Sequence, residues 1–317
     1  MRNHTAITTF ILLGLTDDPH MKILIFIYLL IAYVLSVIGN LIIIILTTVD
    51  SNLQTAMYYF LQNFSFLEIS FTTVTMPRFL YSLSTGDGTI TYSACLCQVF
   101  FMYLFEVTHF YLLTVMSYDR YVAICKHLHY ATIMNYKVCK RLVLCCWTIA
   151  LLIIVPLIIV LQGLEFCDSN VLDHFVCDDK PMLKISCSDT RFLDNMDTVS
   201  SAFILIVTLI FVVWSYVSII LAILRFPSAQ QRKKAFSTCS SHMIVVSITY
   251  GSCMFIYVKP SAKDELTTNK DVTLLSTSVS PMLNPFIYTL RNKQVIQALK
   301  DLVKRLYSSK GIRCVLK

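Results

Sequence analysis

The segment ILIFIYLLIAYVLSVIGNLIIIILTT, residues 23–48, decides the fold of this chain. It contains no Asp, Glu, Lys or Arg, and an α-helix needs about 20 mostly apolar residues to cross a bilayer. Six further long apolar runs follow at residues 57–83, 94–124, 138–161, 196–224, 236–258 and 272–290. Because these runs do not alternate like barrel strands, we expect each to form a helix. The sequence therefore predicts an all-α bundle of seven transmembrane helices.

The composition supports a membrane protein. Of the 317 residues, 56% are hydrophobic and 14% are charged, whereas soluble globular chains carry about 25% charged residues. The net charge of +7 comes from basic residues that flank the apolar runs. This is a pattern of membrane topology and argues against nucleic-acid binding. The early apolar stretch at residues 10–15 is too short for a cleavable signal peptide, so the first long run is expected to direct insertion.

Lysine and arginine predict the orientation, since they accumulate on the cytoplasmic side of a membrane. With the N-terminus outside and the C-terminus in the cytoplasm, 17 of them are cytoplasmic and eight are extracellular. Asn3 begins an N-glycosylation acceptor sequence, which agrees with an extracellular N-terminus. The outer segment at residues 162–195 contains Cys167, Cys177 and Cys187, and such clustered cysteines suggest disulfides in an oxidising compartment.

The C-terminal segment continues as an amphipathic helix. Residues 292–306 have apolar side chains at helical spacing with basic residues between them, which is typical of a helix on a membrane surface. We therefore expect three parts: an extracellular N-terminus (1–22), a seven-helix domain (23–291), and a membrane-surface helix with a cytoplasmic tail (292–317). Cys314 in the tail is either an acylation site or a free thiol.

Several ionisable residues lie inside the predicted spans, where burial of charge is costly and each requires an explanation. Glu68 is in the second span, Glu106 and His109 are about one turn apart in the third, and Asp119 and Arg120 are at its inner end. They do not form a nucleophile–base arrangement, and the cysteines do not form a closely spaced ligand set. We therefore expect no catalytic site, no metal and no cofactor.

Five motifs follow one another along the chain: GN at residues 39–40, MSYDRYVAIC at 116–125, SY at 215–216, KAFSTCSSH at 234–242 and PMLNPFIY at 281–288. In this order they resemble the olfactory receptors, a branch of the rhodopsin-like G-protein-coupled receptors, over nearly the whole chain. Residues 10–19, 60–73, 165–190 and 226–265 resemble family 6, subfamily C in particular.

The resemblance implies a plasma-membrane odorant receptor that is not an enzyme. It would bind a small volatile ligand between its helices, activate a stimulatory G protein of the olfactory type and raise cyclic AMP. Asp119 would hold Arg120 in the inactive state, and an outward swing of the sixth helix would free Arg120. The residues expected to form this switch are Asp119, Arg120, Tyr121, Tyr216, His242, Asn284, Pro285 and Tyr288.

Two parts of this switch have simpler interpretations. Asp119 and Arg120 would alone be compatible with a topology anchor. Pro285 lacks an N–H and interrupts the helix ladder, and such a kink is often static in membrane helices. As a switch, the kink would allow Asn284 to bond alternative polar partners, such as Glu68.

The resemblance also suggests the disulfides Cys95–Cys177 and Cys167–Cys187. These four cysteines allow three pairings, and the sequence alone does not choose among them. Cys97 lies two residues from Cys95 and could compete.

The ligand pocket follows from helical projection near the outer ends of the helices. Its lining is mostly apolar with a few hydroxyls, which suits small, weakly polar ligands. Glu106 has three possible roles: it binds a basic odorant, pairs with His109, or is neutral. The predicted lining residues are Met102, Tyr103, Glu106, Phe110, Ser200, Ser201, Ile204, Tyr250, Cys253, Met254, Tyr257, Leu274, Thr277 and Ser278.

The chain departs from the family pattern at three positions. Gln54 and Ala56 replace the usual His and Pro, which predicts a less rigid first inner loop. His109 replaces an acid that, with the counterpart of Glu68, makes a plausible sodium pocket. The polar core here comprises Asn40, Glu68 and His109, and a protonated His109 would make sodium unnecessary. The alternative is a neutral His109 that bonds to a helix neighbour.

Two other classes of membrane protein are disfavoured. A transporter or channel would have inverted repeats, broken helices or a polar stripe. An intramembrane enzyme would need a third group beside Glu106 and His109. The sequence provides neither pattern.

Overall fold

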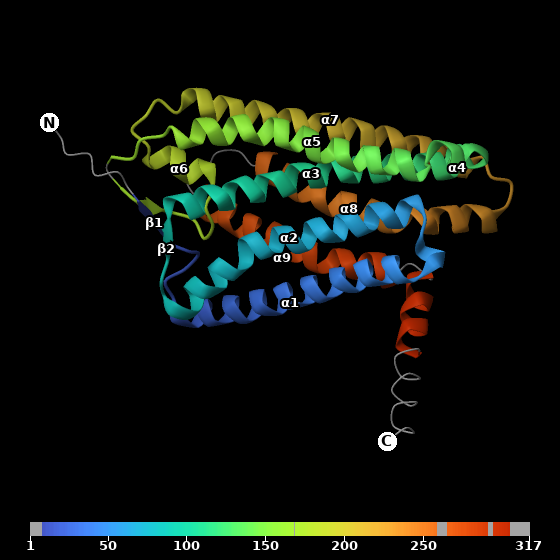
Figure 1. Ribbon diagram of the computed structural model, residues 1–317, viewed down its shortest axis with the longest axis horizontal. Helices are drawn as coiled ribbons and strands as arrows, with labels where there is room; N and C mark the ends of the chain where they lie inside the picture. The colour runs from blue at the N-terminus through green and yellow to red at the C-terminus, as the bar shows by residue number, and fades with distance from the viewer. Residues whose placement is uncertain (1–7, 168, 259–264, 291–293, 305–317) are drawn as a thin grey trace, which may run out of the picture.

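The computed structural model describes residues 8–167, 169–258, 265–290 and 294–304. In these ranges seven long helices run along the molecule (Figure 1). They are α1 (Pro19–Val49), α2 (Ala56–Thr85), α3 (Tyr92–Cys125), α5 (Tyr136–Gln162), α7 (Arg191–Leu224), α8 (Ala229–Val258) and α9 (Glu265–Leu290). Each contains one predicted apolar run, so the predicted all-α seven-helix bundle is confirmed. Most helices extend beyond their apolar runs at one or both ends, because the flanking polar residues also form helical backbone hydrogen bonds.

By length and apolar composition alone, four helices in the described part of the chain could cross a membrane: α1, α3, α5 and α7. The helices α2, α8 and α9 have comparable lengths of 30, 30 and 26 residues. Polar residues interrupt their apolar runs, and Glu68 of α2 and Asn284 of α9 are two of them. Both side chains are buried inside the bundle, so neighbouring helices rather than lipid satisfy them.

Local sequence signals explain where helices begin and end. The side chains of Asp18, Thr91 and Asn135 accept backbone N–H groups at the starts of α1, α3 and α5, as N-cap residues do. Pro19 occupies the first turn of α1, where its missing N–H has no cost. Gly86 ends α2 with φ of 76°, in the left-handed region that favours glycine.

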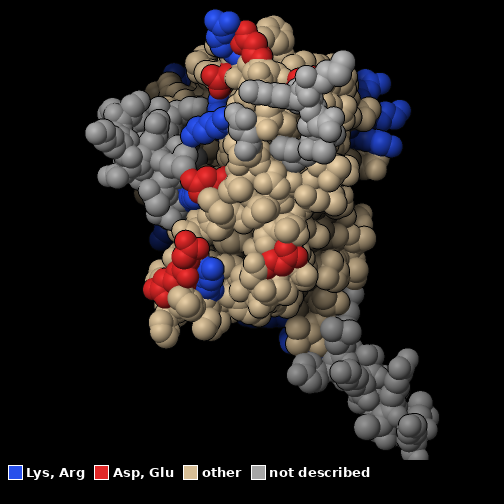
Figure 2. Space-filling view, turned by 90° about the vertical axis from the view of Figure 1, so that its left-hand side faces the viewer, with Lys and Arg blue, Asp and Glu red and all other residues tan. Residues whose placement is uncertain are grey.

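One end of the bundle carries a small β-sheet, and we call this the sheet end. Its strands are β1 (Thr9–Leu12), β2 (Thr89–Thr91) and β3 (Val171–Leu172), in the order β2-β1-β3. β1 is antiparallel to β2 and parallel to β3, and the short helix α6 (Asp179–Ile185) lies at the same end (Figure 1). Figure 2 shows this face, where acidic and basic side chains are scattered over a mostly uncharged surface. The sequence did not predict the sheet.

The opposite end, which we call the α4 end, consists of short helical turns. They are η1 (Ser51–Leu53), η2 (His127–His129) and α4 (Tyr130–Ile133). Residues 294–304 form a further helix, which runs across the long axis of the bundle in Figure 1. This is the described part of the predicted surface helix. Cys314 lies outside the described residues, as does Asn3.

The helices α1 and α9 approach closely at Gly39. A Cβ atom at Gly39 would lie 2.8 Å from the Cβ of Pro285, and real Cβ atoms do not tolerate such a distance. Gly39 therefore allows the contact that places α9 beside α1 and α2.

Candidate functional site

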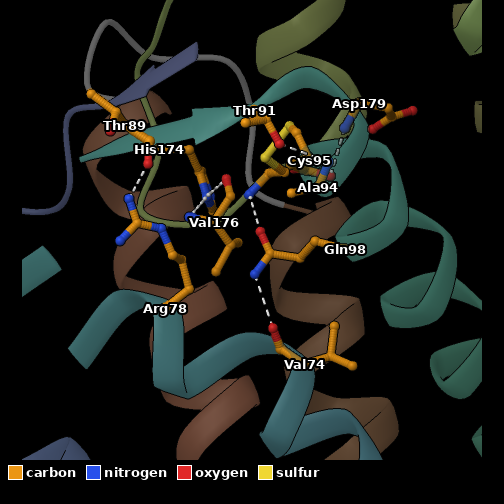
Figure 3. The surroundings of a disulfide bond; sticks show 12 residues. Val74, Arg78, Thr89, Thr91, Ala94, Cys95, Gln98, His174, Val176 and Asp179 are labelled. Carbon is orange, nitrogen blue, oxygen red and sulfur yellow. Dashed lines mark hydrogen bonds between the residues drawn. A yellow bond between two sulfur atoms is a disulfide. The ribbon is translucent and has the colours of Figure 1, made fainter. Parts of the chain in front are cut away.

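A disulfide anchors the segment between α5 and α7 on α3. Cys95, in the first turns of α3, is bonded to Cys177. Gln98 reinforces this link, because its Oε1 accepts from the backbone N of Cys177 (3.0 Å) while its Nε2 donates to the carbonyl of Val74 in α2 (2.9 Å). Figure 3 shows Gln98 between Val74 and the disulfide. The segment is thereby held against the open end of the bundle.

A second disulfide, Cys167–Cys187, closes the neck of the same segment. The carbonyl of Glu165 accepts from the backbone N of Cys187 and from Ser186 Oγ, both at 2.9 Å. Both disulfides are the pairs that the resemblance implied, and Cys97 remains free and exposed. Between the two links, α6 lies over the bundle as a cover.

Beneath α6 lies a cavity of about 650 Å³, lined by residues of α2, α3, α5, α6, α7, α8 and α9. This volume is suited to a small organic ligand. Nine of the predicted pocket residues line it: Met102, Tyr103, Glu106, Phe110, Ser200, Ser201, Ile204, Cys253 and Thr277. The polar-core residues Glu68 and His109 form part of its floor.

The structure places two predicted residues of α9 outside this lining. Ser278 Oγ lies 3.0 Å from the hydroxyl of Tyr28 in α1 and 2.6 Å from the carbonyl of Leu274. Leu274 itself packs in an apolar cluster that includes Leu29 of α1. Ser278 therefore bonds toward α1, and Leu274 packs among residues of several helices. Helical spacing predicts which residues share a face but not the rotation of the helix.

Two predicted residues of α8 also lie elsewhere. The ring of Tyr250 packs edge-on against Phe110, with centroids 5.4 Å apart. Tyr250 therefore contacts a lining residue without lining the cavity itself. Met254 is 42% exposed on the outer surface. The side chain of Tyr257 lies outside the described residues.

Sequence reasoning missed the charged upper wall of the cavity. Asp178, Asp179, Lys180, Lys184 and Asp197 line it from α6 and α7, and Asp173, His174 and Lys270 line it beside the sheet. The acidic composition of residues 162–195 was visible, and Asp178 directly follows the disulfide partner Cys177. Because Cys177 is bonded to Cys95 of α3, this adjacency could have predicted that the acids lie over α3.

Tyr103 connects the α3 wall to this cover. Its hydroxyl lies 2.5 Å from Oδ1 of Asp178 and 2.7 Å from Oδ1 of Asp179. Burial, followed by the nearby charges of Asp178 and Asp197, raises the pKa of Asp179 to about 8. Lys180 is paired with Asp194 at 2.9 Å and with Asp197 at 3.1 Å.

The polar core lies below the cavity. Oε1 of Glu68 accepts a 2.7 Å hydrogen bond from Nδ2 of Asn284 and lies 3.9 Å from Nε2 of His109. That nitrogen has no hydrogen-bond partner among the described residues. Nδ2 of Asn40 lies 2.9 Å from the Ser36 carbonyl and 3.4 Å from the Pro281 carbonyl. The helices α2, α3 and α9 therefore meet at Glu68, and Asn40 of α1 lies beside them.

At the α4 end, Asp119 and Arg120 form a buried ion pair, with Nε of Arg120 3.0 Å from Oδ2 of Asp119. The hydroxyl of Tyr130 in α4 donates to Oδ1 of Asp119 (2.8 Å). Tyr121 packs outward against Trp214 of α7, with ring centroids 4.9 Å apart. Asp119 thus ties Arg120 to the turn that follows α3.

Beside this pair, Tyr216 of α7 is hydrogen-bonded to His242 of α8 through its hydroxyl and the histidine Nδ1. Tyr288 of α9 is almost fully buried, and its hydroxyl has no hydrogen-bond partner within the described ranges. The structure therefore brings residues of α3, α7, α8 and α9 together at this end. All the predicted switch residues are among the described ones, including Asn284 and Pro285 in α9.

The chain shows extensive similarity to known proteins. A sequence profile described as olfactory receptor matches residues 29–310. Olfactory receptor 6C2 of Homo sapiens is 65% identical over 306 residues, which cover 96% of this chain and 98% of the relative. Olfactory receptor 6C68 of Homo sapiens is 62% identical with the same shares, and olfactory receptor 2AP1 of Homo sapiens is 56% identical over 96% of this chain and 99% of its own.

The bundle also matches a solved structure. Squid rhodopsin superposes with a TM-score of 0.74 at 16% identity, over 90% of this chain and 81% of the rhodopsin chain. At that identity the match shows the fold, whereas the sequence relatives show the family. The chain therefore belongs to the olfactory receptors of the family 6, subfamily C group, as a multi-pass receptor of the plasma membrane with the rhodopsin-like fold and no enzymatic role.

Proposed function

We propose that this receptor binds a small volatile odorant in the cavity below α6 and activates a stimulatory G protein of the olfactory type, which raises cyclic AMP. The observation that carries the proposal is a single helix, α3, that lines the cavity with Met102, Tyr103 and Glu106 and ends in the buried pair Asp119–Arg120. A ligand that moves α3 or its neighbours can therefore alter both ends of the bundle.

The arrangement at the α4 end suits an inactive state. Asp119 neutralises Arg120, and the Tyr216–His242 bond joins α7 to α8. In the proposed mechanism, ligand binding favours a second arrangement in which α8 moves outward and this bond breaks. Arg120 then turns toward Tyr216 and the G protein. Such a switch requires only that the ligand bind the second arrangement more tightly.

The proposal includes the orientation, with the sheet end extracellular and the α4 end cytoplasmic. The excess of lysine and arginine in the segments assigned to the cytoplasm supports it, with 17 residues against eight. The two disulfides at the sheet end are also stable only in an oxidising compartment.

The test is cyclic AMP production in cells that express the receptor with an olfactory-type stimulatory G protein, during exposure to an odorant panel that includes amines. Arg120→Ala is expected to abolish the response at unchanged surface level. The matched control is Arg141→Ala, an exposed arginine near the same end, on α5, which should respond like wild type. Equal responses of Arg120→Ala and wild type would contradict the proposed switch.

A further inference from the structure

The upper half of the cavity has more carboxylates than cationic partners. Glu106 of α3, Asp178 and Asp179 beside α6, and Asp197 of α7 all line it. Of these, only Asp197 has an ion pair within the described part of the chain, with Lys180 at 3.1 Å.

The other lysines of the lining do not compensate these acids. Lys270 is paired with Asp173, and Lys184 forms no ion pair with a carboxylate in the described ranges. Glu106, Asp178 and Asp179 therefore form no ion pair in the described ranges, and Lys180, the cation that interacts with Asp179, is itself paired with Asp194 and Asp197.

Asp179 is the least satisfied of the three. The residue is 1% exposed, and its Oδ2 has no hydrogen-bond partner among the described residues. Its Oδ1 and that of Asp178 both lie within bonding distance of the Tyr103 hydroxyl, which carries only one hydrogen. A buried carboxyl group with too few donors is energetically costly, so Asp179 holds a proton while the cavity is empty. A cationic donor would favour its ionised form and bond the unpartnered oxygen.

Glu106 lies one turn below Tyr103, on the same face of α3. It is exposed to the cavity and has no hydrogen bond or ion pair with the described residues. The carboxylates of Asp178 and Asp197 are close enough to interact with it electrostatically, and they have the same sign. A cation at this position would therefore interact favourably with all three carboxylates.

We propose that the upper half of the cavity is a subsite for the ammonium group of a protonated organic amine, with Glu106 and Asp179 as its carboxylate partners. This inference rests on the proposed function, in which the ligand occupies this cavity. An ammonium group has three N–H donors, which matches the unsatisfied oxygens. The apolar remainder of the ligand would contact Phe110 and Ile204, which lie deeper in the same lining. A metal ion fits less well, because the described residues contain no group of three or more metal ligands.

The test measures binding directly, with the full chain purified in lipid nanodiscs and no G protein present. The probes are straight-chain primary amines of four to ten carbons and the alcohols of equal chain length. An amine should bind at least about tenfold more tightly than its matched alcohol, since charge-assisted hydrogen bonds are about twice as strong as neutral ones.

Two variants test which carboxyl groups bind the ammonium group. Glu106→Gln and Asp179→Asn should each reduce amine affinity about tenfold or more and leave the affinity for alcohols unchanged. Asp189→Asn is the matched control, because Asp189 is an exposed acid of the same segment that is paired with Arg191 outside the cavity. It should bind both probes like wild type. If one of the two cavity variants does not fold, judged by thermal unfolding, the other still tests the subsite.

Each outcome separates this inference from the proposed function. Tight amine binding without a cyclic AMP response would support the subsite and contradict the G-protein proposal. Activation by alcohols but not amines would support the proposed function and overturn the subsite. Absence of amine binding to folded receptor at millimolar concentration, or amine affinity unchanged in both variants, would also overturn it.

Discussion

At the sheet end, two disulfides and a three-stranded sheet hold segments that are distant in the sequence over an open cavity. At the α4 end, polar side chains of neighbouring helices contact one another directly, as in Asp119–Arg120 and Tyr216–His242. The sheet end thus resembles a loop-built binding site, whose lining can vary without changing the scaffold. The α4 end is packed so that a change requires one set of contacts to replace another. In the proposed mechanism, recognition and transmission therefore depend on different kinds of interaction.

The largest expected effect is loss of the link between α3 and its cover. Cys177→Ser should lower the free energy of unfolding by about 2–5 kcal/mol and strongly reduce the amount of receptor at the cell surface. Cys187→Ser should lower the free energy of unfolding by about 1 kcal/mol less than Cys177→Ser, because its disulfide closes a loop of 20 residues rather than 82. Thermal unfolding and surface labelling measure both.

Cys97→Ser is the matched control, because Cys97 is a free, exposed cysteine two residues from Cys95. It should behave like wild type. A normal unfolding temperature for Cys177→Ser would show that the sheet end does not depend on its covalent link.

Helix packing toward the α4 end is tested at Gly39. Gly39→Val should destabilise the receptor by about 1–3 kcal/mol, because the added side chain would overlap Pro285 of α9. Thermal unfolding should show the loss, and Gly251→Ala serves as the control. A Cβ at Gly251 in α8 meets no atom within 4 Å, and alanine favours helix over glycine by up to about 1 kcal/mol. Equal stability of Gly39→Val and wild type would argue against the close α1–α9 approach.

A smaller effect concerns pH at the sheet end. Burial raises the pKa of Asp179 from an ordinary 3.8 to about 8, so the folded chain retains a proton that the unfolded chain loses above about pH 4. The contribution of Asp179 to the free energy of unfolding therefore decreases as pH rises from about 4 to 8 and is constant above that. The unfolding temperature of wild type should fall more steeply between pH 6 and 8 than that of Asp179→Asn. Parallel profiles would contradict this assignment.

The smallest expected effect is at the polar core between the two ends. Glu68 already accepts from Asn284, and His109 lies beside the same oxygen, so we expect sodium to be unnecessary here. Replacing sodium by choline should leave basal and ligand-stimulated cyclic AMP unchanged in wild type. A sodium effect that Glu68→Ala removes would refute this expectation.

The sequence predicted the helices well because apolar runs and capping residues are local signals. Of the residues that it predicted for the ligand pocket, Tyr103, Glu106 and Phe110 line the cavity together, since residues three and four apart share a helix face. It also predicted Leu274 and Ser278 for the pocket, whereas Ser278 lies against Tyr28 of α1 and Leu274 packs in an apolar cluster with Leu29. The rotation of α9 depends on contacts such as that between Gly39 and Pro285, which no local pattern reveals.

The charged cover was harder to predict for another reason. Asp178 and Asp179 belong to a polar segment without strong periodicity, and they reach the cavity only because Cys177 is bonded to Cys95. The sheet likewise combines strands of two or three residues with one of four. Such short strands form only once distant segments have been brought together.

The position of β1 in the middle of its sheet has a consequence for biosynthesis. Thr9–Leu12 is made before α1, yet its parallel neighbour Val171–Leu172 follows only after α5. Throughout that interval one edge of β1 has unpaired N–H and C=O groups, which other chains can bind. The sheet around β1 is therefore complete only after the loop between α5 and α7 has been made.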